Sequence, residues 1–223
     1  ETAGDLLSMT LNVGYAVSSS ILIGVFIVAL VTQLNSKRYN PLLYWTVILA
    51  TSTAGTTISD YMDRTLKLGY TNGSIILITI LLTTLAFWRS STGSLSVTNI
   101  KTTKVEVFYW TAILFSNTLG TALGDFLADT SGLGFAGGAF LISSLLALIL
   151  AAHYYTQISQ VFLFWAAFIL TRPFGATLGD LMTKTHEKGG LNFGTVGFFS
   201  IILAAVFGCW YASEKTLAMH SLA

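Results

Sequence analysis

A carboxylate-bearing motif returns along the chain and constrains the fold more than any other feature. Its longest copy is Thr171-Arg-Pro-Phe-Gly-Ala-Thr-Leu-Gly-Asp180, and the same pattern stands upstream as Gly120-Thr-Ala-Leu-Gly-Asp125 and Gly55-Thr-Thr-Ile-Ser-Asp60. A shortened copy, Glu1-Thr-Ala-Gly-Asp5, opens the chain. Four copies of one segment indicate a protein built from internal repeats.

The spacing around the motif identifies the repeating unit. A tryptophan stands fifteen residues before the aspartate in three copies, at Trp45, Trp110 and Trp165. A glycine followed by an aromatic residue comes nine residues after the aspartate in three copies, as Gly14-Tyr15, Gly69-Tyr70 and Gly134-Phe135. The aspartates are 55, 65 and 55 residues apart. This pattern predicts a two-helix hairpin that was duplicated twice.

The composition places these hairpins in a membrane. Of the 223 residues, 53% are hydrophobic and 9% are charged, whereas soluble domains carry about a quarter charged residues. Segments of roughly 20 apolar residues can span a bilayer. We therefore expect an all-α, polytopic transmembrane helix bundle with seven helices, at about 14–35, 41–62, 73–90, 107–128, 134–156, 160–182 and 193–212.

The repeats group into two halves. Residues 1–90 hold repeats one and two, without the first helix, and residues 107–223 hold repeats three and four. The polar stretch 91–106 is the expected linker. Because a two-helix unit returns the chain to the side it left, all four units share one orientation, which is the parallel-repeat arrangement.

Basic residues suggest which side faces the cytoplasm, because Lys and Arg are enriched in cytoplasmic loops. The tryptophan ends carry six and the aspartate ends carry four. We expect a multi-pass protein of a bacterial inner membrane with cytoplasmic tryptophan ends. The six are Lys37, Arg38, Arg89, Lys101, Lys104 and Lys215, and the four are Arg64, Lys67, Lys184 and Lys188.

The motif aspartates are the main candidates for chemistry, since an ionisable residue in a membrane segment is costly and a functional hypothesis by default. The alternative is that each aspartate only caps a helix end. Carboxylate and hydroxyl oxygens suit protons or hard cations such as Na⁺, Mg²⁺, Ca²⁺ or Mn²⁺. The candidate cation or proton site consists of Glu1, Asp5, Asp60, Asp125 and Asp180 with Thr57, Thr121 and Thr177.

Arg172 is particular to the fourth copy, because Ser52 and Asn117 hold the same motif position in the second and third copies. A buried arginine needs a partner, so we expect it to pair with an aspartate. That pair is either a fixed internal salt bridge or a counter-charge released when a cation or proton binds. Pro173 lacks a backbone donor and should kink or locally open the helix.

The remaining polar residues suggest less. Asp63, Asp129 and Glu187 are expected to be solvated caps at outer helix ends. The single cysteine, Cys209, and three histidines without metal-ligand spacing provide no zinc or copper site. The tryptophans are interpreted as interfacial anchors or packing residues.

The repeat resembles a family of bacterial membrane proteins built from a repeat of unknown function with a characteristic tryptophan. The segments that carry the resemblance are Glu1-Thr-Ala-Gly-Asp5, Phe108-Tyr-Trp110 and the stretch from Thr171 to Asp180. Family members begin with one more tryptophan-bearing helix, so the resemblance implies eight helices in the full protein. It implies no activity.

The function we expect is transport of a small hard cation, coupled to protons, by the cluster of repeat aspartates with Arg172 as counter-charge. The alternatives are a cation channel with an acidic ring and a structural or partner subunit of the membrane. An enzyme is not expected, because no Ser/His or HExxH pair is present. The expected partners are the lipid bilayer, a cation or proton and a second copy of the chain, with no nucleic acid and no cofactor other than a bound cation.

Overall fold

A computed structural model describes residues 14–36, 40–97, 100, 102–194 and 197. These residues are helical, with no strand among them. The chain forms two compact units, 1–178 and 179–223. The elements are α2 (Tyr15–Asn35), α3 (Pro41–Asp60), η2 (Tyr61–Thr65), α4 (Gly69–Thr92), α5 (Thr103–Asp125), η3 (Phe126–Thr130), α6 (Gly134–Tyr155), α7 (Gln160–Thr183) and η4 (His186–Lys188).

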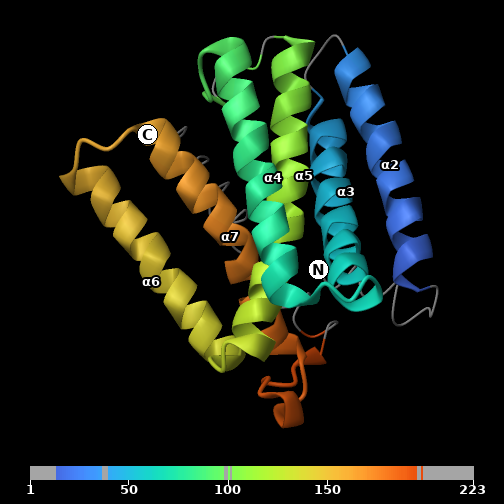
Figure 1. The fold of residues 1–223 in the computed structure, drawn as a ribbon, viewed down its shortest axis with the longest axis vertical. Helices are drawn as coiled ribbons and strands as arrows, with labels where there is room; N and C mark the ends of the chain where they lie inside the picture. Colours follow the sequence, from blue (N-terminus) through green and yellow to red (C-terminus); the bar gives the residue numbers. More distant parts are fainter. Residues whose placement is uncertain (1–13, 37–39, 98–99, 101, 195–196, 198–223) are drawn as a thin grey trace, which may run out of the picture. The chain divides into compact units, whose positions relative to one another are not determined.

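Six of the seven expected segments are confirmed as helices, and the all-α class is correct. The seventh, 193–212, lies almost entirely outside the described residues. The largest differences in boundary are at α4 and α5, which each begin four residues early, at Gly69 rather than residue 73 and at Thr103 rather than residue 107. Within the first unit, α4, α5, α3 and α2 lie side by side in that order (Figure 1).

The periodic glycine marks the start of the second helix in repeats one, two and three. Gly14 is the N-cap of α2, and Gly69 and Gly134 are the first residues of α4 and α6. All three have positive φ, at 83°, 73° and 66°, and Gly194 in the second unit has 67°. A residue with a Cβ is strained in this region, whereas glycine is not. The sequence signal therefore reports a left-handed residue between the helices of a hairpin.

The motif helices α3 and α5 run parallel and meet at equivalent residues. The hydroxyl groups of Tyr44 and Tyr109 lie 3.1 Å apart, and those of Thr56 and Thr121 lie 3.3 Å apart. Both pairs are separated by 65 residues, so contacts follow the same order along both helices. This agrees with repeats that share one orientation.

Small residues set the distance between successive motif helices. A Cβ placed on Gly55 would lie 2.9 Å from both Cβ of Asn117 and the backbone nitrogen of Thr118. A Cβ on Gly120 would overlap the Cβ of Arg172. Asn117 and Arg172 each stand three residues before the motif glycine of their own repeat. The α3–α5 and α5–α7 contacts are therefore copies of one packing arrangement, as expected for membrane helices that approach through small residues.

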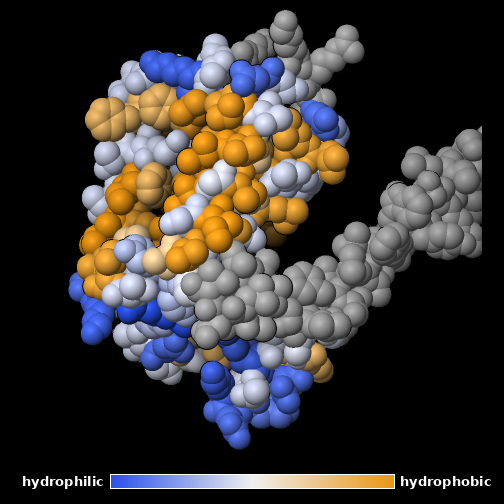
Figure 2. All heavy atoms as spheres, turned by 90° about the vertical axis from the view of Figure 1, so that its right-hand side faces the viewer, coloured by the Kyte–Doolittle hydropathy of each residue, from blue (hydrophilic) through white to orange (hydrophobic). Residues whose placement is uncertain are grey.

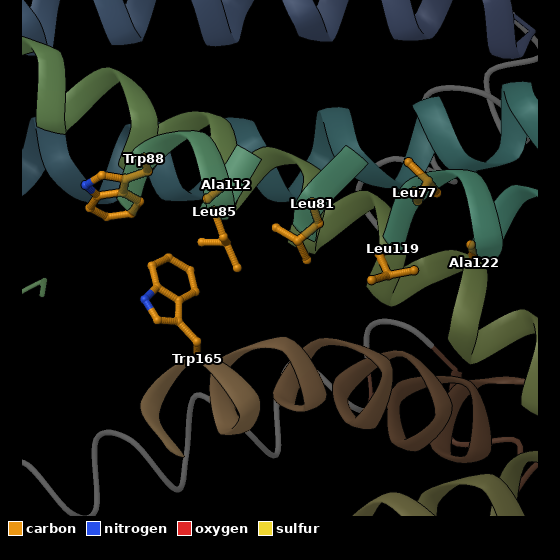
Figure 3. Packing of buried hydrophobic residues seen from close by; sticks show 8 residues of the cluster. All are labelled: Leu77, Leu81, Leu85, Trp88, Ala112, Leu119, Ala122 and Trp165. Atoms are coloured by element: carbon orange, nitrogen blue, oxygen red, sulfur yellow. The ribbon is translucent and has the colours of Figure 1, made fainter. Parts of the chain in front are cut away.

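One cluster of buried apolar side chains lies between α4 and α5, and a second joins α2, α3 and α5. Leu77, Leu81, Leu85 and Trp88 form one stripe of α4, and they pack with Ala112, Leu119 and Ala122 of α5 and Trp165 of α7 (Figure 3). The rings of Trp88 and Trp165 meet edge to face at 5.6 Å, and the indole of Trp165 donates to the carbonyl oxygen of Leu95 at 3.1 Å.

The motif tryptophans differ in environment although they share a motif position. Trp110 and Trp165 are buried, at 1% and 4% exposure, whereas Trp45 is 60% exposed. The expectation of packing residues is confirmed for Trp110 and Trp165, and Trp45 is available for an interfacial role.

The helices identify a membrane protein. Four of them, α2, α4, α6 and α7, are long and apolar enough to cross a bilayer. On the side where α2 lies, hydrophobic side chains cover the middle of the surface and hydrophilic ones gather toward its ends (Figure 2). Val17, Val25 and Val28 of α2 are about half exposed or more. The motif helices α3 and α5 contain more buried polar residues than these four helices. Some of these polar residues contact each other between α3 and α5.

Two glycines at the same motif position should respond oppositely to an added methyl group. Gly120→Ala would push against Arg172 and should lower stability by about 1–3 kcal/mol, the usual range for overpacking. Gly175→Ala should be neutral or gain up to about 1 kcal/mol from helix propensity, because Gly175 is exposed and no described atom lies within 4 Å of the position that its Cβ would take. Thermal unfolding in detergent measures the stability of both variants. Equal effects would contradict the close contact that Gly120 makes with Arg172 and that Gly175 lacks among the described residues.

Candidate functional site

A turn of π-helix follows the aspartate in repeats two and three. Asp60 ends α3 and is followed by η2, and Asp125 ends α5 and is followed by η3. In each turn the amide of the sixth residue binds the carbonyl oxygen of the first, at 2.9 Å from Leu66 to Tyr61 and from Ser131 to Phe126. Single π-turns are rare and occur frequently at functional sites. No sequence signal had indicated them.

Arg64 lies within the first of these turns and binds both aspartates. Its Nε lies 3.0 Å from Oδ1 of Asp60, and its Nη2 lies 3.5 Å from Oδ2 of Asp125. Asp60 is 2% exposed and Asp125 is 7% exposed, whereas the side chain of Arg64 is 37% exposed. The planar guanidinium presents several donors in a fixed fork, which suits it to bridge two carboxylates. One arginine thus joins repeats two and three.

The helix of repeat one also contacts this arginine. Arg64 donates from Nη1 to the hydroxyl oxygen of Tyr15 at 3.1 Å, and its guanidinium lies 5.8 Å from the centre of that ring. Burial by itself would lower the pKa of Arg64, but Asp60 and the neighbouring Asp125 raise it above its ordinary value. Arg64 therefore stays charged at every physiological pH.

The sequence interpretation missed the role of Arg64, which it counted only as a loop charge. A signal was available, since Arg64 stands four residues after Asp60, the spacing at which helix side chains meet. Lys184 has the same spacing from Asp180, while the equivalent position in repeat three is the acidic Asp129.

The second unit repeats the local ion pair. Asp180 is 8% exposed, and the Nζ of Lys184 lies 3.5 Å from its Oδ1. Glu1 and Asp5 lie outside the described residues. Of the predicted set of carboxylates, the structure therefore brings Asp60 and Asp125 together. Within the described part of the chain, no group of three or more His, Cys, Asp or Glu is arranged to hold a metal ion.

The predicted threonine ligands are buried and engaged in helix contacts. Thr57 donates to the carbonyl oxygen of Ala54 at 3.1 Å, and Thr177 donates to that of Pro173 at 2.9 Å. Thr121 shares a hydrogen bond with Thr56. Their oxygen atoms keep acceptor capacity, but these bonds tie the threonines to backbone or to each other.

Asp63 corrects the prediction of a solvated cap. It is 6% exposed, its Oδ2 lies 3.4 Å from the hydroxyl of Ser59, and its carboxylate lies against Gly73 of α4. The π-turn rotates residue 63 toward α4 instead of toward water. Burial raises the pKa of Asp63 above its ordinary value, against the lowering effects of Ser59 and Arg64. Asp129 and Glu187 are exposed, as expected.

Arg172 has a different partner from the one predicted. Its Nη1 donates to the hydroxyl oxygen of Ser52 at 3.4 Å, and its guanidinium lies 5.8 Å from the ring centre of Phe168. Among the described residues it forms no ion pair with a carboxylate. Its Cβ lies against Gly120 of α5, and its guanidinium reaches Ser52 of α3. Helix α7 continues through Pro173 without a break.

Comparison with known proteins identifies the repeat. The family described as Repeat of Unknown Function (DUF347) matches four tandem segments, at residues 1–39, 43–94, 108–159 and 163–216. The chain belongs to this family. The match confirms the resemblance and the four repeats. The hairpins α3–α4 and α5–α6 each overlap one matched segment, although α3 and α5 begin a few residues before it. No curated protein and no solved structure matches the chain.

Removing the Arg64 charge should destabilise the first unit of this repeat protein. Arg64→Gln leaves two buried carboxylates close together, and because Arg64 is partly exposed we expect a loss of about 1–3 kcal/mol rather than the larger cost of a fully buried pair. Adding Asp60→Asn and Asp125→Asn should restore most of the stability. Arg89→Gln, at an exposed arginine, is the control in thermal unfolding. A triple variant as unstable as the single one would contradict the ion-pair account.

Asp63 should make stability depend on pH in a direction that its raised pKa fixes. As the pH falls, the folded protein takes up this proton before the unfolded chain does, so the group favours folding at low pH and loses that effect as the pH rises through the folded-state pKa. Asp63→Asn should therefore raise the melting temperature at pH 7 and flatten its change between about pH 4 and pH 7. The exposed Asp129→Asn serves as control. A steeper pH dependence in Asp63→Asn would contradict the burial argument.

Proposed function

We propose that this protein transports a small hard cation across a bacterial inner membrane, coupled to protons, through its repeat aspartates. The observation that supports the proposal most directly is the Asp60–Arg64–Asp125 group, in which two almost fully buried carboxylates share one partly exposed guanidinium. Ionisable residues inside membrane proteins are rare and are found along ion and proton pathways.

In the proposed mechanism, Asp60 and Asp125 exchange Arg64 for a proton or a cation as their partner. Without a cation, Arg64 compensates the charges of Asp60 and Asp125. A proton or hard cation that reaches the carboxylates takes over this compensation, and the arginine side chain, 37% exposed, is free to turn toward water. Carboxylate oxygens are ligands that Na⁺, Mg²⁺, Ca²⁺ and Mn²⁺ accept. In this proposal the counter-charge role belongs to Arg64, because it contacts the aspartates directly, and Lys184 serves Asp180 in the same way.

The glycine contacts allow the necessary movement. Close packing at Gly55 and Gly120 keeps the motif helices together along their length, while the π-turns after Asp60 and Asp125 leave the helix ends outside that packing. We propose that binding alters these ends first and that cytoplasmic tryptophan ends stay packed. A structural subunit, in which the ion pairs only hold helices together, is the competing function.

Cation flux should depend on the two described aspartates that share Arg64. In proteoliposomes loaded with a pH-sensitive dye, Asp60→Asn with Asp125→Asn should reduce Mn²⁺- or Na⁺-driven proton movement by at least about tenfold, the scale expected when a charged ligand is lost. Asp129→Asn, an exposed aspartate four residues after Asp125, should stay close to the unmodified protein.

Two results would overturn transport by these carboxylates. Flux that persists in the double variant would separate transport from the aspartates. Absence of flux in the unmodified protein for Na⁺, Mg²⁺, Ca²⁺ and Mn²⁺ alike, together with loss of stability in the variants, would favour the structural subunit. If single-channel conductance is observed in planar bilayers, the protein is a channel and not a transporter.

A further inference from the structure

A second polar group lies deeper among the motif helices, away from the aspartates. It consists of Thr51 and Ser52 on α3, Asn117 on α5 and Arg172 on α7, here called the polar layer. Ser52 stands eight residues before Asp60, which is about 12 Å along the helix. Arg172 is twelve residues from the first and eleven from the last residue of α7, one of the helices apolar enough to span the membrane. The layer therefore lies near the middle of the span that α7 provides.

Asn117 has a fixed orientation that leaves its carbonyl oxygen unsatisfied. Thr51 donates its hydroxyl proton to the carbonyl oxygen of Ile48 at 2.8 Å. The group of Asn117 that faces Thr51 must then be a donor, and its Nδ2 lies 3.1 Å from Oγ1 of Thr51. The residue is 4% exposed, and its Oδ1 has no hydrogen-bond partner among the described residues. A buried acceptor without a donor is costly, so this atom indicates a missing donor.

Arg172 shows the opposite need. It is half-buried in a membrane-spanning helix, and its contacts among the described residues are a hydroxyl oxygen and an aromatic ring, neither of which carries a negative charge. An arginine at this depth requires a compensating charge. Among the described residues, the layer thus combines a cation without an anionic partner and an acceptor without a donor.

We propose that Arg172, Ser52 and Asn117 form a binding site for a small monovalent oxyanion that also carries a hydroxyl group. Hydrogencarbonate and 2-hydroxy carboxylates share this chemistry. The anionic oxygens accept from the guanidinium and from the hydroxyl of Ser52, and the ligand hydroxyl donates to Oδ1 of Asn117. Because Ser52, Asn117 and Arg172 hold the same motif position in successive repeats, divergence at one position has produced the complementary groups.

This site is separate from the proposed cation pathway and does not depend on it. The carboxylates at Asp60 and Asp125 bind positive charge, and the polar layer binds negative charge one helix segment away. Anion binding should therefore survive in the Asp60→Asn, Asp125→Asn variant, so failure of either proposal is visible without the other.

Lactate and propionate distinguish this site from a general anion site, because they differ only in one hydroxyl group. Isothermal titration of the full chain in lipid nanodiscs should show that lactate binds at least about tenfold more tightly than propionate, the scale of one satisfied buried acceptor. Hydrogencarbonate should bind in a titration of its own, and it should displace lactate when both are present. Equal affinity for lactate and propionate, or binding of neither lactate nor hydrogencarbonate, would overturn the proposal.

Variants test separately the contact of Arg172 with the anionic oxygens and the contact of Asn117 with the ligand hydroxyl. Arg172→Gln should lower the affinity for both lactate and propionate by at least about tenfold. Asn117→Leu should abolish the preference for lactate while propionate still binds. Arg172→Lys keeps the charge and should retain weakened binding, which tests the charge if the glutamine variant does not fold. Arg89→Gln, at an exposed arginine, is the control. Lactate binding that is unchanged in both Arg172 variants would overturn the assignment.

Discussion

Two buried carboxylates that share one guanidinium determine how the aspartate ends of repeats two and three come together. Asp60 and Asp125 would repel each other at low dielectric if both were charged and alone. Arg64 allows them to lie at neighbouring helix ends, 3.0 Å and 3.5 Å from its nitrogens, and it also contacts Tyr15 of the preceding repeat. The π-turn after Asp60 places Arg64 in this position, so helix geometry and charge compensation depend on each other.

The contacts between the motif helices of the first unit depend on close packing of small residues and on polar contacts. Lipid is as apolar as leucine, so membrane helices associate through small residues and polar contacts. Gly55 and Gly120 supply the same contact to the next motif helix, and the hydroxyl pairs Tyr44–Tyr109 and Thr56–Thr121 keep the parallel helices in register. A duplicated sequence therefore reproduces one interface, and the repeats differ at residues that line it, such as Ser52, Asn117 and Arg172.

The sequence predicted those features that repeat, and it missed those that depend on how one helix end is rotated. Helices, hairpins and the left-handed glycines follow from periodic residues such as Gly69 and Gly134. Asp63 illustrates the limit, since one π-turn moved it from the expected solvated side to a 6% exposed position against α4. Trp45 and Trp110 share a motif position and differ from 60% to 1% exposure because equivalent repeats have different neighbours. Spacing alone carries no information on such neighbours.

The residue four positions after each aspartate differs between the repeats and decides which aspartates have a basic residue of their own repeat beside them. Repeat two has Arg64 there and repeat four has Lys184, so each can compensate its own aspartate. Repeat three has the acidic, exposed Asp129 there, and Asp125 contacts the arginine of its neighbour. Because one guanidinium contacts two carboxylates, the proposed mechanism implies that protonation or cation binding at Asp60 changes the charge compensation that Arg64 gives to Asp125. The acidic residue at this position of repeat three thus leaves Asp60 and Asp125 in contact with one arginine, and the three residues form one group.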